Sequence, residues 1–209
     1  MATEMYIRLS IDGKEYEGNL TQILQPVVSN VFSKASSCSP YVDKRDGQSY
    51  RCIKIGGQVW LAQNLNYEIE DSFCYNNNPE QGELYGRLYS WAAALGVCPL
   101  GWHLPSKAEW LKLAEFIGIH TAATALKSIT GWVGENSGTD EYGFAALPAG
   151  YRSERDKDFH YIGKLAGWWT ASELSADKAC AVRVNSNAVQ IQTEEYGKLS
   201  AFSVRCIKD

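Results

Sequence analysis

Hydrophobic and polar positions alternate near the N-terminus and predict a small β-hairpin. Ile7, Leu9 and Ile11 are separated by single polar residues, which is the period of a strand with one buried face. Asp12-Gly13 follows at once, and this dipeptide is typical of tight hairpin turns. We therefore expect a hairpin over residues 5–17.

The residues after this hairpin change to a helical period. Apolar positions between 20 and 31 recur three and four residues apart, Asn19 is a candidate N-cap, and Pro26 is expected to kink or shorten the helix. Small and polar residues from 33 to 40 indicate a linker. Residues 1–41 are therefore predicted to be a hairpin-helix appendage, too small to bury a core, that attaches or oligomerises a main domain over residues 42–209.

The first part of the main domain is predicted to contain short strands. Alternation over residues 50–55 and 58–61, on either side of two glycines, indicates a second hairpin. A Gly-rich, irregular stretch follows later in the chain, and within it residues 143–148 are expected to form a short strand.

Two helices are predicted between these strands. Apolar residues at helical spacing indicate one over 84–96 and a second over 106–117. The second is better marked, because Ser106 followed by Glu109 has the spacing of a capping box and Gly118 can end the helix. Its buried stripe is expected to consist of Trp110, Leu111, Ala114 and Ile117.

The last forty residues alternate most regularly and predict an antiparallel meander with one buried and one polar face. Because successive strand residues point to opposite faces, only one of Trp168 and Trp169 is expected to face the core. Helices early in the chain and a meander late indicate an α+β fold. The inward positions are expected to be Cys180, Val182, Val184, Val189, Ile191, Phe202, Val204 and Cys206.

Composition and charge narrow the classes of partner. The net charge is −4 with no basic run, which argues against nucleic acid as a partner. No apolar stretch is long enough to span a bilayer, so we expect no membrane insertion. The first residues lack a basic segment followed by an apolar one, and we expect no signal peptide in this chain.

The six cysteines are dispersed at positions 38, 52, 74, 98, 180 and 206. No C-x-x-C motif occurs, so a zinc cluster or a thioredoxin-type redox site has no support. An even number of scattered cysteines favours at least one structural disulfide in an oxidising compartment. The sequence leaves the pairing open, and several cysteines could instead be small buried residues.

Several blocks of the chain resemble a known family, the Fibrobacter succinogenes major paralogous domain (FISUMP). The resemblance begins near residue 43 and covers about 165 residues with the blocks in order, which leaves the first forty-one outside it. The blocks include IGGQVW at 55–60, YGRLYSW at 85–91, CPLGWHLP at 98–105, WWTASE at 168–173 and FSVRC at 202–206.

This resemblance implies the C-type-lectin-like fold that formylglycine-generating enzymes also use. It also implies a disulfide between Cys98 and Cys206. Apart from the resemblance, we take Cys38 and Cys52 as a second candidate pair across the predicted linker. Residues 169–189 resemble the variable cassette of diversity-generating-retroelement target proteins, in which a constant skeleton alternates with diversified positions. An aromatic residue expected near Cys180 in such cassettes is absent here.

The residues offer little catalytic chemistry. A formylglycine-generating enzyme needs paired late cysteines, and Cys180 and Cys206 are expected to be buried or disulfide-bonded instead. His103, between Trp102 and Leu104, has the setting of a packed histidine rather than a general base. The Glu-Pro-Asn, Gln-Pro-Asp and Trp-Asn-Asp triplets of calcium-dependent lectins do not occur. We therefore expect no enzyme activity, metal or cofactor.

The meander instead presents a candidate recognition surface. Trp169 is expected to be its aromatic anchor, with Glu173 and Arg183 beside it. The alternative is that these residues form an ordinary solvated sheet face. The residues expected to bind ligand fall into two groups. The outward positions of the meander are Ala181, Arg183, Asn185, Asn187, Gln190 and Gln192, with Ala188 also on the outward side, and the residues expected on the flanking loops are Trp169, Ser172, Glu173, Glu194 and Tyr196.

The sequence thus predicts a non-enzymatic binding protein that displays this surface to a protein or glycan receptor. The resemblance implies an extracellular setting, as an adhesin on a bacterial surface or a phage tail. Residues 1–41 could make it a homo-oligomer. The alternatives are an enzyme of the formylglycine-generating type and a purely structural surface domain.

Overall fold

The computed structural model describes residues 6–11, 14–19, 35–134 and 138–209, and it divides the chain into two units at residues 34 and 35. In the first unit, β1 (Tyr6–Ile11) pairs antiparallel with β2 (Lys14–Asn19), and Ile11 lies opposite Lys14. The predicted N-terminal hairpin is confirmed. Its Asp12-Gly13 turn and the predicted helix after residue 19 lie outside the described residues.

The second unit starts with a strand where a linker was expected. β3 (Ala35–Val42) pairs with β4 (Ser49–Ile55), so the linker prediction over 33–40 is wrong for the residues that the structure describes. β3 lies at the edge of its sheet and is mostly exposed, which explains its small polar residues. Cys38 lies opposite Cys52, and the two form a disulfide.

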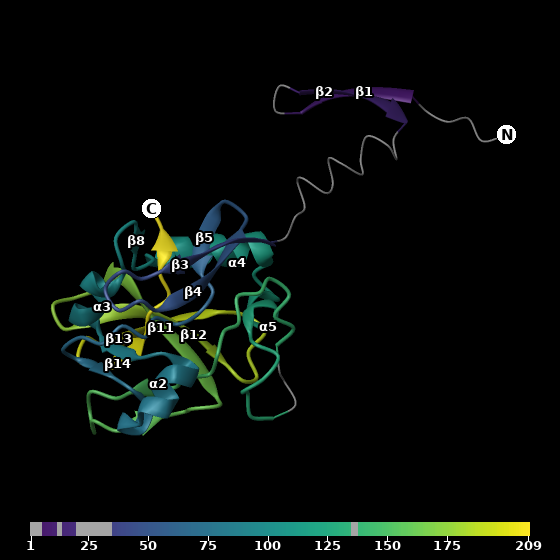
Figure 1. Cartoon of the computed structure of the whole chain (residues 1–209). Helices are drawn as coiled ribbons and strands as arrows, with labels where there is room; N and C mark the ends of the chain where they lie inside the picture. The colour runs from purple at the N-terminus through teal and green to yellow at the C-terminus, as the bar shows by residue number, and fades with distance from the viewer. Residues whose placement is uncertain (1–5, 12–13, 20–34, 135–137) are drawn as a thin grey trace. The chain divides into compact units, whose positions relative to one another are not determined.

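Both ends of this unit meet in one five-stranded sheet, in the order β3-β4-β5-β15-β8. β5 (Gln58–Leu61) completes the predicted hairpin with β4, and β15 (Ile207–Lys208) lies between β5 and β8 (Trp102–His103). This sheet lies at the end of the domain that carries the C-terminus (Figure 1).

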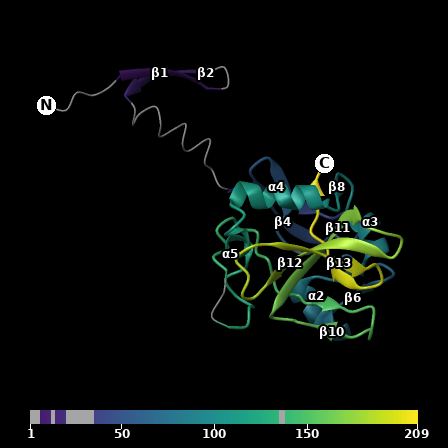
Figure 2. The ribbon, with the colours of Figure 1, turned by 180° about the vertical axis from the view of Figure 1, so that it is seen from behind.

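A second sheet of eight strands runs through the middle of the domain (Figures 1 and 2). β11 (Leu165–Glu173), β12 (Lys178–Asn185) and β13 (Gln192–Gly197) form the predicted antiparallel meander. β14 (Ala201–Ser203) then returns parallel to β11, so this sheet is mixed rather than wholly antiparallel. The remaining strands are β6 (Ser72–Phe73), β7 (Leu88–Ser90), β9 (Tyr151–Arg152) and β10 (Phe159–His160).

The helix predicted over 84–96 is wrong, because two helices and a strand occupy this region. α2 (Pro79–Tyr85) ends at Gly86, β7 follows, and α3 (Trp91–Val97) begins after Ser90, whose side chain caps it. Gly86 has a φ of 77°, and a Cβ there would come within 2.7 Å of Asn64 Cβ. The chain therefore turns sharply where it packs against the segment after β5. A short 3₁₀ helix, η1 (Tyr75–Asn77), precedes α2.

The second predicted helix is confirmed as α4 (Lys107–Ile117), with the Ser106–Glu109 capping box and an end at Gly118. Its buried stripe differs at one position, because Leu113 is fully buried and Leu111 is exposed. A short helix that was not predicted, α5 (Ala122–Leu126), packs against α4. No helix among the described residues is both long and apolar enough to cross a bilayer.

Trp168 and Trp169 are both buried, which corrects the expectation that only one faces the core. Trp168 stacks on Trp110 of α4 at 5.1 Å, whereas Trp169 packs edge-on against Phe202 at 5.0 Å on the other side of β11. β11 is a central strand with β12 on one side and β14 on the other, so separate core clusters cover its two faces. Both neighbouring tryptophans are therefore core residues.

Other C-terminal predictions also differ. Residues 186–191 form a loop rather than a strand, and Val189 is 57% exposed. Residues 143–148 contain only an isolated bridge from Ala146 to Lys127. Arg205 alternates with the inward positions Val204 and Cys206, which favours a polar face for it. It is instead fully buried and donates to Phe144 O at 2.6 Å and to Asn64 Oδ1 at 2.9 Å. Burial lowers the pKa of Arg205 to about 9.

Candidate functional site

Most of the predicted surface residues lie on one face of β12 and β13. The register places Ala179 opposite Tyr196, Ala181 opposite Glu194, and Arg183 opposite Gln192. Directly opposed residues of antiparallel strands project to the same face. The meander therefore brings Arg183, Asn185 and Gln192 onto one face, as the alternation predicted. Glu194 and Tyr196 lie on the same face, as part of strand β13 rather than of the flanking loop that was expected.

Part of this face is covered by the core. Trp169 and Ala181 are both 0% exposed, so the expectation that they lie on the surface is wrong. Their cover includes Phe202 of β14, whose ring lies so close over Gly167 that a Cβ there would approach Phe202 Cδ1 to 2.6 Å. The exposed part of the face begins at Arg183, opposite Gly167. Trp169 is thus a structural support beneath the surface.

Three polar side chains form a connected group at this point. Arg183 pairs with Glu194, and its Nη1 donates to the Tyr196 hydroxyl at 3.3 Å. The Tyr196 hydroxyl in turn donates to Glu194 Oε2 at 3.2 Å. Burial raises the pKa of Tyr196, so this hydroxyl stays protonated at neutral pH. Arg183 Nε is buried and has no hydrogen-bond partner in the part of the chain that the structure describes.

A layer of aromatic rings continues from the core to this group. Phe202 stacks on Tyr151 at 5.1 Å with an interplanar angle of 6°, and Tyr151 stacks on Tyr161 at 6.0 Å and 11°. Tyr196 packs on both Phe202 and Tyr151. Phe202 is fully buried, whereas Tyr161 is 56% exposed. We call the surface formed by Tyr151, Tyr161, Tyr196, Arg183 and Glu194 the tyrosine patch.

The backbone holds Tyr161 in an uncommon conformation, with a φ of 64°. Gly150 lies beside it, and a Cβ at Gly150 would come within 2.3 Å of His160 O, so the two segments approach very closely. His160 also contacts both carboxylate oxygens of Asp156, at 3.1 and 3.2 Å. The backbone N–H of Asp158 and this histidine lower the pKa of Asp156 to about 2. Tyr161 is therefore presented by a tightly packed turn.

The other predicted residues lie apart from the tyrosine patch or have structural partners. Ser172 Oγ accepts from the Lys107 N–H at 3.0 Å and joins β11 to the start of α4. Glu173 pairs with Lys198, near the end of β11 that pairs with Ala179 rather than Arg183. Gln190 contacts His120 Nδ1 at 2.8 Å, and exposed Asn187 and half-buried Ala188 share its loop. The structure does not bring these residues together with Arg183.

Sequence reasoning missed Tyr151 and Tyr161 as surface residues. They come from β9 and from the turn after β10, more than twenty residues before Arg183 in the chain. A usable signal was the density of rings in Phe159-His160-Tyr161 after Gly150-Tyr151, which indicates a short aromatic hairpin. Their position beside Arg183 depends on the order of the strands in the sheet.

The candidate catalytic groups of the sequence were the late cysteines and His103. Cys98 and Cys206 form a disulfide, which confirms this pairing, so Cys206 and buried Cys180 are not a dithiol pair. His103 is not packed as expected, because its half-exposed ring bridges Asp209 Oδ1 at 2.6 Å and Glu109 Oε1 at 2.9 Å. Among the described residues, no group of three or more His, Cys, Asp or Glu is placed to hold a metal ion.

These features define a disulfide-bonded α+β domain with a mixed central sheet and an aromatic, charged patch at its surface. The sequence model of the Fibrobacter succinogenes major domain matches residues 53–208, more than half of the chain, and the chain belongs to this family. Neither a curated protein nor a solved structure matches the chain.

Proposed function

We propose that this protein is a non-enzymatic binding protein that recognises a protein or glycan receptor through the tyrosine patch. The observation that carries the proposal is the half-exposed Tyr161 ring, stacked on Tyr151 beside the Arg183–Glu194 ion pair. Tyrosine and arginine are the residue types that dominate binding energy at interfaces, since they combine a large contact area with polar groups.

The rigidity of the tyrosine patch favours binding. Tyr161 is braced by Tyr151, and Tyr151 by the buried ring of Phe202, so little side-chain freedom remains to be lost when a partner binds. Arg183 and Glu194 have side chains 23% and 40% exposed, and a partner can replace water around both charges. An ordinary solvated sheet face needs neither the aromatic stack nor the uncommon backbone at Tyr161.

The resemblance of the sequence to its family supports a proposal for the scaffold and for the place where the protein acts. We propose a C-type-lectin-like scaffold on a bacterial surface or phage tail, with the first unit, residues 1–34, rather than the whole of 1–41, attaching or oligomerising it. Within the cassette-like segment 169–189, buried Val182 and Val184 suit a constant skeleton, whereas Arg183 and Asn185 are accessible positions for diversification. Closely related chains from one strain or phage test this idea, because their substitutions should fall on accessible positions of the sheet and spare the buried ones.

The binding proposal is tested by screening the full chain against glycan arrays and cell-surface proteins, then measuring affinity for the ligand found. We expect Tyr161→Ala and Arg183→Ala each to weaken binding by at least about tenfold. Lys178→Ala is the matched control, since Lys178 forms an ion pair with Glu195 on the opposite face of the same two strands. Unchanged affinity in both patch variants, or an equal loss in the control, would place the site elsewhere.

A further inference from the structure

A second concave surface lies beside α2. It is a cleft of about 440 Å³, formed where the turn after β3, the segment after β5 and helix α2 meet. This volume is within the range of small-molecule sites. We call it the Asp46 cleft, and its lining includes Asp46, Gln48, Asn66, Tyr67, Glu83 and Arg87.

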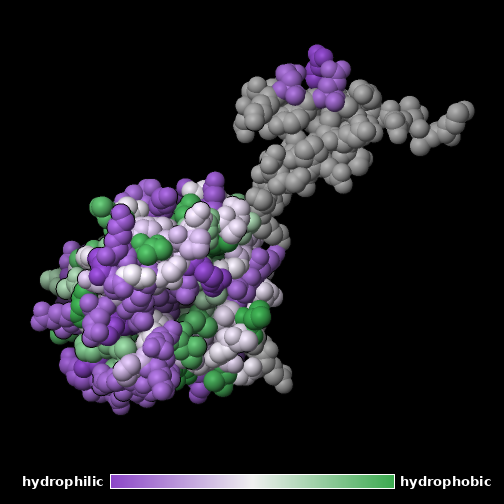
Figure 3. Space-filling view, in the orientation of Figure 1, coloured by the Kyte–Doolittle hydropathy of each residue, from purple (hydrophilic) through white to green (hydrophobic). Residues whose placement is uncertain are grey.

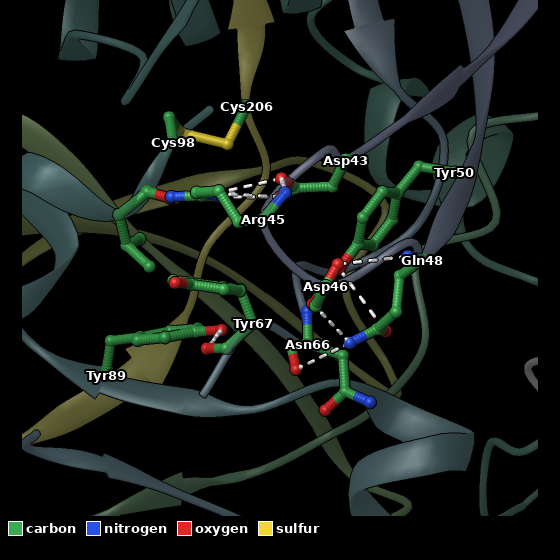
Figure 4. Close-up of polar contacts among 11 residues, drawn as sticks. Asp43, Arg45, Asp46, Gln48, Tyr50, Asn66, Tyr67, Tyr89, Cys98 and Cys206 are labelled. Carbon is green, nitrogen blue, oxygen red and sulfur yellow. Dashed lines mark hydrogen bonds and ion pairs between the residues drawn. A yellow bond between two sulfur atoms is a disulfide. The ribbon is translucent and has the colours of Figure 1, made fainter. Parts of the chain in front are cut away.

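One wall of the cleft is held by a hydrogen-bond network (Figure 4). Gln48 donates to both carboxylate oxygens of Asp46, from its backbone N–H at 3.0 Å and from Nε2 at 2.7 Å. The same Nε2 contacts Asn66 O at 3.2 Å, and the Asn66 N–H donates to the Tyr50 hydroxyl at 3.1 Å. Burial raises the pKa of Tyr50 to about 12, so this hydroxyl stays protonated. The carboxylate of Asp46 is therefore oriented in advance.

The backbone next to Asn66 is fixed by further contacts through Tyr67. Arg45 forms an ion pair with Asp43 at 2.6 Å, and its guanidinium lies 3.9 Å from the centre of the Tyr67 ring. The Tyr89 hydroxyl donates to Tyr67 O at 2.8 Å. The segment that carries Asn66 is thus held from both sides (Figure 4).

Two polar side chains of the cleft have hydrogen-bonding capacity to spare. Only the backbone of Asn66 takes part in the contacts above. Its side-chain amide has no hydrogen-bond partner in the described part of the chain, and in Figure 4 it extends away from the contacts of Gln48. Glu83, on α2, has no ion pair with any described residue. An amide and a carboxylate on facing elements can together accept and donate hydrogen bonds to one ligand.

The charge of the cleft selects among ligand classes. Arg87, which pairs with Glu68 at 2.6 Å, is the one cation among the described residues that line the cleft, whereas Asp46, Glu68 and Glu83 are carboxylates, and this excess of negative charge disfavours an anion. The described carboxylates are not grouped as a metal ion requires. One face of the Tyr67 ring is already taken by Arg45, so the cleft lacks the aromatic cage that an organic cation prefers. Hydroxyl groups remain the best match for this set of oriented amides and carboxylates.

We infer that the Asp46 cleft binds a neutral saccharide, whose hydroxyls donate to Asp46 and Glu83 and exchange hydrogen bonds with the Asn66 amide. This site is built from segments other than those of the tyrosine patch. It therefore does not depend on the function proposed for that patch.

The test is saturation-transfer NMR of the full chain with free glucose, galactose, mannose, N-acetylglucosamine and maltose. We expect at least one sugar to bind and Asn66→Ala or Glu83→Gln to weaken it by about tenfold, the effect of one lost hydrogen bond to a charged or buried group. Glu80→Gln is the matched control, because Glu80 is exposed on the same helix and does not line the cleft. Unchanged thermal unfolding of each variant shows that the fold is intact.

The inference is overturned if none of these sugars gives a signal, or if binding survives the double variant Asn66→Ala/Glu83→Gln. A sugar signal that is lost in Arg183→Ala but kept in the double variant would assign the sugar to the tyrosine patch, and it would also overturn the inference. Conversely, a receptor lost in Arg183→Ala while sugar binding persists would support both sites separately.

Discussion

Gly167→Ala tests how the core supports the tyrosine patch. Gly167 is the third residue of β11, and an added Cβ would lie 2.6 and 2.9 Å from two carbons of the Phe202 ring and 3.2 Å from Leu165 Cδ2. Carbon atoms in contact are normally about 3.5–4.0 Å apart, so the ring would have to move by about 1 Å. Phe202 is packed against Trp169, Tyr151 and Tyr196, with ring centroids 4.6–5.1 Å away, and has little room to do so.

Overpacking of this kind costs about 1–3 kcal/mol of unfolding free energy. Replacing glycine by alanine also restricts the unfolded chain, which favours the folded state by about 0.4–1 kcal/mol. We therefore expect Gly167→Ala to be destabilising, and expect receptor affinity to fall as well because Tyr151 and Tyr196 rest on the displaced ring. Urea unfolding followed by tryptophan fluorescence measures the first effect, and binding measures the second.

Gly96→Ala is the control for this experiment. Gly96 is exposed within α3, and a Cβ there would meet no atom within 4 Å. Alanine in a helix interior is better than glycine by about 0.5–1 kcal/mol, so this variant should be more stable than the parent. The packing argument is refuted if Gly167→Ala is as stable as the parent protein, or if the two variants shift stability in the same direction.

Three further predictions concern stability. Replacing the Cys98–Cys206 disulfide, which links residues 108 apart, should lower the free energy of unfolding in denaturant by about 3–5 kcal/mol. Replacing the Cys38–Cys52 disulfide, whose cysteines are 14 apart, should cost less, and equal losses would contradict the loop-entropy argument. Burial lowers the pKa of His103, but hydrogen bonds to two carboxylates outweigh this and the net pKa is raised. Its contribution to stability should thus be complete below pH about 6.5 and disappear as pH rises through the folded-state pKa; a His103→Gln variant whose melting temperature has the same pH dependence as the parent would disprove it. Val182→Ala should cost about 1–3 kcal/mol in urea unfolding because Val182 is fully buried, and a change below about 0.5 kcal/mol would contradict that core position.

Local patterns predicted the local elements well. The capping box at Ser106 and Glu109, the alternation in β1 and β12, and the glycine end of α4 involve only neighbouring residues, so the sequence shows them directly. The region around Gly86 failed for the opposite reason. Its apolar residues suit one long helix, but Gly86 packs closely against the segment near Asn64 and the helix is interrupted there.

The prediction of the binding surface was likewise right where it depended on local pattern and wrong where it depended on distant segments. Figure 3 shows small apolar groups scattered among hydrophilic residues, so the face in that view has no single dominant apolar area that marks a site. Alternation placed Arg183, Asn185 and Gln192 on one face correctly, because that relation depends only on the strand period and register. Glu194 and Tyr196 were expected on a flanking loop and instead belong to β13. The expectation that Trp169 lies on a flanking loop at the surface was wrong, since the sequence does not reveal that β14 returns beside β11 and covers the strand with Phe202.

The sequence alone therefore determined the α+β class, the family, the first two strands of the meander and the face that Arg183 and Asn185 share on β12. Only the tertiary structure decided which part of that face reaches solvent, because burial depends on strands and rings contributed from distant segments. Tyr151 and Tyr161 join Arg183 because β9, β10 and β14 lie in the same sheet as β12. A period of two along a strand specifies its two sides, and only the neighbouring elements specify which side is covered.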